Sequence, residues 1–236
     1  MEIVFLDRSS LGHDLNYKIL EENFHIKSYD TTEAIDVVSR CENADVVITN
    51  KVRLDAKVLS QFKKLKMIII TASGTNNIDL NYAKKINISV KNAIGYASES
   101  VAFHTFAMYF HLNQNLKNYR DYTEKLQWPK HHSFSYFENF QDLSHQNWGI
   151  IGLGSIGLQV AKIAKTFGSH VSYFSTSGKN TNKDFPKVEL DELLENSDII
   201  SIHCPLNQLT EGLIGKLELE KMKSCHTLLN LSRGNI

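Results

Sequence analysis

Short hydrophobic runs alternate with longer amphipathic stretches over residues 1–97 of the chain. Five runs rich in β-branched residues each predict a buried strand, over 3–6, 26–29, 46–49, 67–71 and 88–90. Between them, apolar residues recur at spacings of three and four, which predicts amphipathic helices over 11–21, 32–41, 55–62 and 80–85. Because strands that alternate with helices are typical of a parallel sheet, we expect one open α/β domain here.

A long apolar helix introduces a second series of strands. Ser98 offers a helix cap and Glu99 an acidic first turn, so we expect a helix from about 101 to 116 and a domain boundary between residues 97 and 98. A polar connection rich in histidine and aromatic residues follows over 117–146. The pattern then predicts strands over 148–151, 171–174, 199–203 and 227–231, and helices over 156–167, 190–195 and 216–222.

Composition narrows the class of protein. The 236 residues are 42% hydrophobic and 22% charged, which is typical of a soluble globular chain and excludes disorder. The 26 basic and 26 acidic residues cancel, so no net charge favours nucleic acid or a membrane surface, and a small ligand fits better. Cys41, Cys204 and Cys225 have neither disulfide nor zinc-site spacing, so we expect no metal and a cytoplasmic location. No signal peptide and no apolar run of about 20 residues is apparent.

A glycine-rich segment between a predicted strand and a predicted helix carries the strongest local signal. In Gly152-Leu-Gly154-Ser-Ile-Gly157, the first glycine permits a tight turn, the second lets a pyrophosphate approach the backbone, and the third lets helix and strand pack closely. The helix N-terminus adds free N–H groups. The alternative is an ordinary strand-to-helix turn, but this context favours a dinucleotide held by Gly152, Gly154, Ser155, Ile156 and Gly157.

The end of the next strand, 171–174, bears on which dinucleotide binds. An acidic residue is expected there when the cofactor carries a free ribose 2′-hydroxyl, and no carboxylate appears before Asp184. Hydroxyl and ammonium groups accept a 2′-phosphate that a carboxylate would repel, so NADP is favoured over NAD. The alternative is a polar loop that binds the ribose loosely. The donors in question are Ser175, Thr176, Ser177 and Lys179.

Five segments, in order along the chain, resemble the D-isomer-specific 2-hydroxyacid dehydrogenase family, and within it the hydroxypyruvate reductase or glycerate dehydrogenase type. The segments are Thr71-Ala-Ser-Gly-Thr-Asn-Asn-Ile-Asp79, Tyr96 to Phe106, the glycine motif within 149–157, Leu193 to Gly215, and Asn230-Leu-Ser-Arg-Gly234. The resemblance implies an α/β protein of two open parallel-sheet domains. Residues 1–97 would be a flavodoxin-like substrate domain that lacks its C-terminal return segment, and 98–236 a Rossmann NAD(P)-binding domain that is incomplete at its C-terminus.

The resemblance also implies a reaction, the transfer of hydride between NAD(P)H and a small 2-keto acid of the hydroxypyruvate or glyoxylate type. The catalytic arginine of the family corresponds to Arg233, whose planar guanidinium suits a substrate carboxylate. The family's carboxylate-binding loop corresponds to Ser73 and Gly74, and a homodimer is expected through the second domain. The remaining positions that line the cofactor correspond to Thr105, His203, Pro205, Thr210 and Leu231.

The proton donor of the family is a histidine, paired with a glutamate, and both lie downstream of the arginine. The sequence ends at Ile236, before either position, and none of its ten histidines replaces the donor by motif. We therefore expect a C-terminally truncated chain, and a noncatalytic fragment or nucleotide-binding module is the alternative to a reductase. A formate dehydrogenase of the same architecture needs no such histidine, but its substrate loop should differ from residues 72–74.

Overall fold

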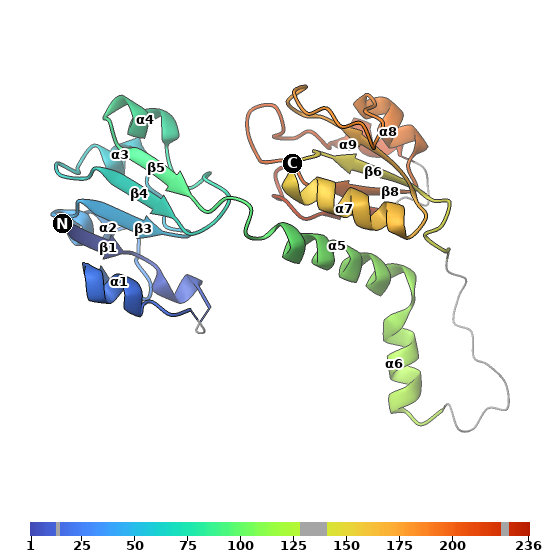
Figure 1. The fold of residues 1–236 in the computed structure, drawn as a ribbon, viewed down its shortest axis with the longest axis horizontal. Coiled ribbons are helices and arrows are strands. Elements are labelled where there is room, and N and C mark those ends of the chain that lie inside the picture. The colour runs from blue at the N-terminus through green and yellow to red at the C-terminus, as the bar shows by residue number, and fades with distance from the viewer. Residues whose placement is uncertain (13–14, 128–140, 223–226) are drawn as a thin grey trace. The chain divides into compact units, whose positions relative to one another are not determined.

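The computed structural model describes residues 1–12, 15–127, 141–222 and 227–236. Cys225 and much of the predicted connection over 117–146 lie outside these residues. Contacts within the chain divide it into two compact units, Met1–Tyr96 and Ala97–Ile236 (Figure 1).

The first unit contains a five-stranded parallel sheet of order β2-β1-β3-β4-β5. This is the flavodoxin-like order, in which the direction of winding reverses between β1 and β3. The expected α/β fold with parallel sheets is confirmed, and every strand lies within one or two residues of its predicted range. The strands are β1 (Glu2–Phe5), β2 (His25–Ser28), β3 (Val46–Thr49), β4 (Met67–Ile70) and β5 (Ser89–Asn92).

Several helices of this unit are shorter than their sequence patterns predict. Within the range 11–21, α1 begins at Lys18, whose backbone N–H donates to Asn16 Oδ1 at 3.0 Å, and a 3-10 turn, η1 (Arg8–Ser10), precedes the range. The helix expected over 32–41 is also too long, because Thr32 donates instead to the carbonyl of Leu6. The helices are α1 (Lys18–Asn23), α2 (Val37–Cys41), α3 (Ala56–Leu59) and α4 (Leu80–Lys85).

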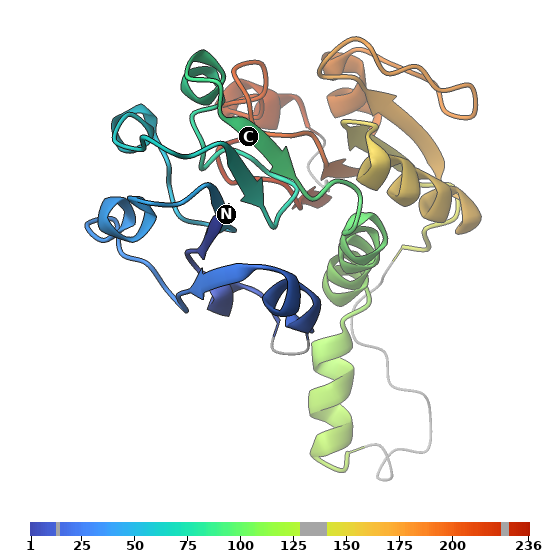
Figure 2. The same ribbon diagram turned by 60° about the vertical axis from the view of Figure 1, so that its left-hand side comes forward.

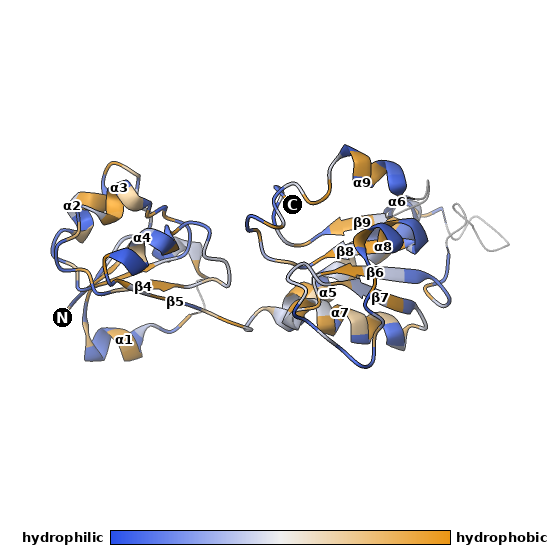
Figure 3. Cartoon of the chain, turned by 90° about the horizontal axis from the view of Figure 1, so that it is seen from above, coloured by the Kyte–Doolittle hydropathy of each residue, from blue (hydrophilic) through white to orange (hydrophobic). Residues whose placement is uncertain are grey.

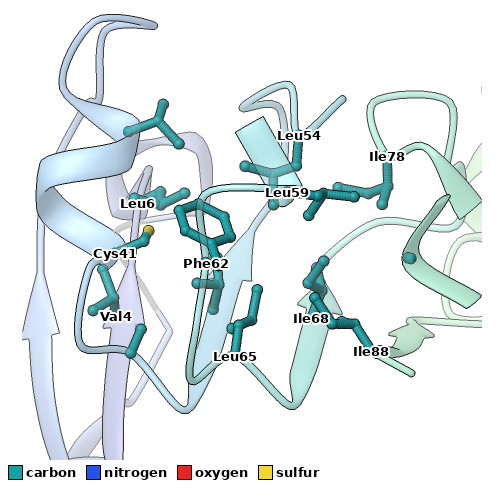
Figure 4. Close-up of a cluster of buried hydrophobic side chains, with 14 of the residues drawn as sticks. Val4, Leu6, Cys41, Leu54, Leu59, Phe62, Leu65, Ile68, Ile78 and Ile88 are labelled. Carbon is teal, nitrogen blue, oxygen red and sulfur yellow. The ribbon is translucent and has the colours of Figure 1, made fainter. Parts of the chain in front are cut away.

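One hydrophobic cluster joins α2, α3 and α4 to the sheet (Figure 4). Leu6 follows β1, Leu59 belongs to α3 and Ile68 to β4, and none of their side chains is exposed to solvent. Burial of such a side chain contributes about 1.5–3 kcal/mol. The cluster therefore holds these helices against the sheet, whose backbone pairing sets the strand register.

The second unit contains a parallel sheet of order β7-β6-β8-β9. An isolated parallel bridge between Tyr173 and Lys187 extends it, because β6 already occupies the other edge of β7. With this bridge counted as a reduced third strand, the order is 3-2-1-4-5, as in the Rossmann fold. The strands are β6 (Asn147–Ile151), β7 (His170–Phe174), β8 (Ile199–Ile202) and β9 (Thr227–Asn230), and the helices of the series are α7 (Ser155–Thr166), α8 (Leu190–Asn196) and α9 (Lys216–Lys221).

Helices α5 (Ser98–Asn113) and α7 lie side by side against one face of this sheet (Figures 1 and 2). Phe106 of α5 packs on Trp148 of β6 with ring centroids 4.9 Å apart, and Trp148 is fully buried. In Figure 3 strand β8 is largely hydrophobic, whereas α8 also carries hydrophilic residues, as expected of a helix that covers a sheet.

Part of the predicted polar connection is helical, which corrects the sequence interpretation. Helix α5 ends at Asn113, Asn115 has a left-handed backbone with φ 50°, and α6 (Leu116–Glu124) follows. Ion pairs one helical turn apart stabilise α6, from Lys117 to Asp121 at 2.8 Å and from Arg120 to Glu124 at 2.7 Å. Within the described residues, every helix is too short or too polar to span a lipid bilayer.

Candidate active site

The carboxyl ends of the strands in the second sheet place the predicted cofactor residues along one edge. Gly152 follows β6, Ser175 follows β7, and His203 follows β8. Backbone bonds join these ends, since Gly152 N donates to Phe174 O at 2.9 Å and His203 N donates to Ile151 O at 2.8 Å. The direction of winding reverses between β6 and β8, and ligands of open α/β sheets bind at such a reversal.

Each glycine of the motif has a different structural reason. Gly152 has φ +94°, and a Cβ there would lie 2.8 Å from the backbone nitrogen of Cys204. A Cβ on Gly157 would lie 2.2 Å from the carbonyl oxygen of Gly152, so α7 and β6 touch at this point. A Cβ on Gly154 would meet nothing within 4 Å, which leaves open space over that residue for a ligand. The turn therefore has the shape that a pyrophosphate requires.

The first turn of α7 offers unused hydrogen-bond donors. The first bond of the helix runs from Leu158 N to Gly154 O at 2.9 Å, and no side chain caps its N-terminus. Among the described hydrogen bonds, none uses the backbone N–H of Ser155, Ile156 or Gly157. These N–H groups and the positive end of the helix dipole suit an anionic phosphate. The residues present therefore fit a dinucleotide.

Residues 175–182, which we name the ribose loop, follow β7. Gly178 N donates to Ser175 O at 3.0 Å and closes a turn in which Gly178 has φ +69°. Ser175 is only 5% exposed, and its Oγ accepts a bond from Asn180 N at 3.3 Å. The Ser175 hydroxyl thus lies beneath the loop, whereas the side chains of Ser177 and Lys179 are exposed and Thr176 is half-buried.

Hydrogen bonds of a buried threonine hold the segment that follows β8. The Thr210 side chain is fully buried, and its hydroxyl donates to Pro205 O at 2.6 Å and accepts from Asn207 N at 2.8 Å. Thr105 of α5 is fully buried as well, and its hydroxyl donates to Val101 O at 2.8 Å. Both threonine hydroxyl groups are thus hydrogen-bonded to backbone groups of the protein, which the sequence alone does not reveal.

His203 and Cys204 differ from reactive side chains in their protonation. Both ring nitrogens of His203 are buried without a hydrogen-bond partner among the described residues, and burial lowers the pKa of this histidine to about 4. Burial raises the pKa of the Cys204 thiol to about 11. At neutral pH the imidazole is therefore neutral and not an imidazolium acid, and the thiol is not in its nucleophilic thiolate form.

Arg233 lies in a tight turn that follows β9. Asn230 Nδ2 donates to Arg233 O at 2.9 Å, and Ser232 N donates to Asn230 Oδ1 at 3.0 Å. Ser232 Oγ donates to the carbonyl of Cys204, which ties this turn to the segment after β8. The structure thus places Arg233, with an exposed side chain, and Leu231 at the same sheet edge as residues 152–154, which we name the glycine turn.

In the first unit, Ser73 and Gly74 form the loop that follows β4. Asn92 Nδ2 donates to Ser73 O at 2.7 Å, and Ser73 Oγ donates to Ala93 O at 3.1 Å. Among the described hydrogen bonds, none uses the backbone N–H of Ser73 or Gly74. The loop therefore presents two donors on a fixed backbone, an arrangement that suits a carboxylate.

Sequence reasoning missed Asp7, which orders the loops at the carboxyl ends of β1 and β3 in the first unit. Its carboxylate is 6% exposed and accepts the backbone N–H groups of Asn50 at 2.9 Å and Lys51 at 2.6 Å. An acidic residue directly after the first strand is the signal that could have found it. No cluster of three metal-ligating side chains occurs in the described ranges, so nothing in them indicates a metal.

These features define a dinucleotide-binding protein of the doubly wound α/β class. The family model of the "D-isomer specific 2-hydroxyacid dehydrogenase, NAD binding domain" matches residues 106–236. The chain belongs to the D-isomer-specific 2-hydroxyacid dehydrogenase family. Its relatives are named dehydrogenases and reductases of 2-hydroxyacids, so by family it is an NAD(P)-dependent oxidoreductase.

Three similar proteins illustrate the match. The chain is 34% identical to a glycerate dehydrogenase of Methylorubrum extorquens and covers 73% of that protein, with 100% of the chain aligned. It is also 34% identical to a hydroxypyruvate reductase of Blautia hydrogenotrophica, over 99% of the chain and 75% of the relative. Among solved structures, D-lactate dehydrogenase from Aquifex aeolicus, complexed with NAD and lactic acid, has a TM-score of 0.87 and 30% identity, covering 99% of the chain and 69% of that structure.

Proposed function

We propose that this chain carries the cofactor site and the substrate-binding arginine of a reductase that prefers NADPH and reduces small 2-keto acids of the hydroxypyruvate or glyoxylate type. One observation carries the proposal. Arg233 lies at the carboxyl end of β9, on the same edge as the open space over Gly154 and the free N–H groups of α7. An arginine at this edge is suited to a carboxylate held beside a dinucleotide.

The cofactor residues follow from the geometry of the second unit. The N–H groups of Ser155, Ile156 and Gly157 bind the pyrophosphate, and the exposed Ser177 and Lys179 bind the 2′-phosphate. Because Ser175 is buried, it shapes the ribose loop instead of presenting its hydroxyl at the surface. The bound nicotinamide supplies the hydride. NADPH is preferred because the loop offers donors and no carboxylate before Asp184.

The substrate roles rest on charge and on free donors. Arg233 binds the carboxylate of the keto acid and stabilises the negative charge that develops on its carbonyl oxygen. In the first unit, the N–H groups of Ser73 and Gly74 are suited to an anionic group of a substrate. His203 is not the proton donor, since burial lowers its pKa to about 4. The donor is a separate group, which the family places downstream of the arginine.

Oxidation of NADPH with hydroxypyruvate, glyoxylate and pyruvate tests this function in the protein at its full natural length. We expect activity with the first two substrates, and Arg233→Ala should lower the catalytic efficiency roughly a hundredfold or more. Arg233→Lys keeps the charge but loses the planar fork, so it should recover only part of the loss. An unchanged efficiency in Arg233→Ala would refute the role of Arg233, and formate oxidation without keto-acid reduction would refute the proposed substrate class.

A further inference from the structure

Asn180 holds the ribose loop by three hydrogen bonds to three different segments. Its side-chain Nδ2 donates to Leu153 O at 3.1 Å, its backbone N donates to Ser175 Oγ at 3.3 Å, and its backbone O accepts from Tyr173 OH at 3.2 Å. Leu153 is the middle residue of the glycine turn, and Ser175 begins the ribose loop. A single residue thus joins the ribose loop, to which the proposed function assigns the 2′-phosphate, to the glycine turn, which leads into the pyrophosphate donors of α7.

The bond to Leu153 orients a donor of the glycine turn. In a planar trans peptide the C=O and the following N–H point in opposite directions. With Leu153 O held by Asn180, the N–H of Gly154 points away from the ribose loop, and none of the described bonds uses it. The space over Gly154 is also open. The Asn180 amide therefore presets a phosphate donor in the glycine turn.

Asn180 is itself anchored on a rigid part of the unit. Tyr173 is 1% exposed, and its hydroxyl also accepts Asn182 N at 3.0 Å. Lys187, whose bridge extends the sheet beside β7, donates from Nζ to Gly178 O at 3.2 Å. Because the anchors belong to the sheet, the loop is held at a fixed position relative to the glycine turn.

We propose that Asn180 is a positioning residue for the adenosine half of the cofactor: it sets the spacing between the donors for the pyrophosphate and the donors for the ribose 2′-phosphate. The inference rests on the proposed function. It predicts that removal of the amide weakens binding of the adenosine half and leaves the chemical step unchanged.

The test compares Asn180→Ala with Asn182→Ala by titration with NADPH and with adenosine 2′,5′-diphosphate. Asn182 is the matched control, because it lies in the same loop, its side chain accepts Asp184 N at 2.8 Å, and it has no described bond to the glycine turn. We expect Asn180→Ala to raise the Kd of both ligands about tenfold, equivalent to about 1.4 kcal/mol, and Asn182→Ala to change neither. In steady-state reduction of the keto acid, Asn180→Ala should raise the KM for NADPH and keep kcat.

The possible failures are distinct. If the unaltered protein binds neither ligand, the proposed function fails and this inference fails with it. If the unaltered protein binds NADPH and Asn180→Ala binds it equally well, only the inference fails. A fall in kcat with unchanged KM would also overturn it. Asn180 is exposed, so the variant should fold, and thermal unfolding of the two alanine variants measures this directly.

Discussion

The third glycine of the motif is packed directly against the first. A Cβ atom on Gly157 would lie 2.2 Å from the carbonyl oxygen of Gly152, which is a backbone atom that cannot move aside cheaply. A Cβ on Gly154, only three residues earlier, would meet nothing within 4 Å. The same residue type therefore serves packing at one position and ligand access at the other.

This difference predicts that two alanine substitutions affect different properties, one the stability of the fold and the other the binding of the dinucleotide. Gly157→Ala should destabilise the fold by about 3 kcal/mol, because α7 must move away from β6. Gly154→Ala should leave the free energy of unfolding within about 0.5 kcal/mol of the unaltered protein, and it should weaken dinucleotide binding because the methyl group occupies the open space. Urea unfolding and NADPH titration of both variants check this. Equal losses of stability would contradict it.

Lys179 should select for the 2′-phosphate. We expect Lys179→Ala to raise the Kd for NADPH about tenfold and to leave the Kd for NADH unchanged. The effect should shrink as salt rises, because exposed charges are screened. Lys183→Ala, from the same stretch of sequence but outside the ribose loop, is the control. An equal loss for NADPH and NADH would show that Lys179 does not contact the 2′-phosphate.

His203 should make stability depend on pH in a defined window. Its pKa is lowered from 6.5 to about 4 in the folded protein, so between these values the unfolded chain binds a proton that the folded chain does not. Its contribution to stability is fully present above pH 6.5 and is lost as the pH falls towards 4.

Comparison with His203→Asn isolates this contribution, which amounts to up to about 3 kcal/mol. The free energy of unfolding of the variant, measured by urea at several pH values, should fall less steeply on acidification. Ser201→Ala, a variant at a buried group that does not titrate, should keep the slope of the unaltered protein. A slope that survives in His203→Asn would contradict the prediction.

A buried hydrogen bond supports the strand that precedes the glycine turn. Trp148 Nε1 donates to Ser201 Oγ at 2.9 Å, and both side chains are fully buried. Ser201→Ala leaves the indole N–H without a partner and should cost about 1–3 kcal/mol of stability. Ser172→Ala, in the neighbouring strand β7, is the control. Thermal unfolding measures both, and equal midpoints for the two variants would contradict this role.

The hydrophobic pattern predicts the strands well and the polar elements poorly. Strand β3 occupies the predicted residues 46–49, because a strand buried on both faces is a continuous apolar run. Helix α6 was not predicted, because only Leu116, Tyr119 and Tyr122 recur at helical spacing in an otherwise polar stretch. Ion pairs along its surface stabilise it. The reduced strand at Lys187 has no run at all, because a single bridged residue carries no periodicity.

In the candidate site, too, the sequence predicts some features and not others. The glycine motif and Arg233 could be located from the sequence, because their positions follow from strand ends. The burial of Ser175 could not, since it depends on Asn180, which bonds to it across the ribose loop. The full burial of Thr105 and Thr210 likewise depends on neighbours that the motifs do not specify.

The central claim is that this chain holds a nicotinamide dinucleotide at the glycine turn and prefers NADPH. Titration of the protein with NADPH and with NADH, followed by the fluorescence of the reduced nicotinamide, tests it most directly. The account predicts saturable binding of both, with NADPH bound more tightly, and loss of this binding in Gly154→Ala. No saturable binding of either dinucleotide, or binding that Gly154→Ala does not weaken, would contradict it.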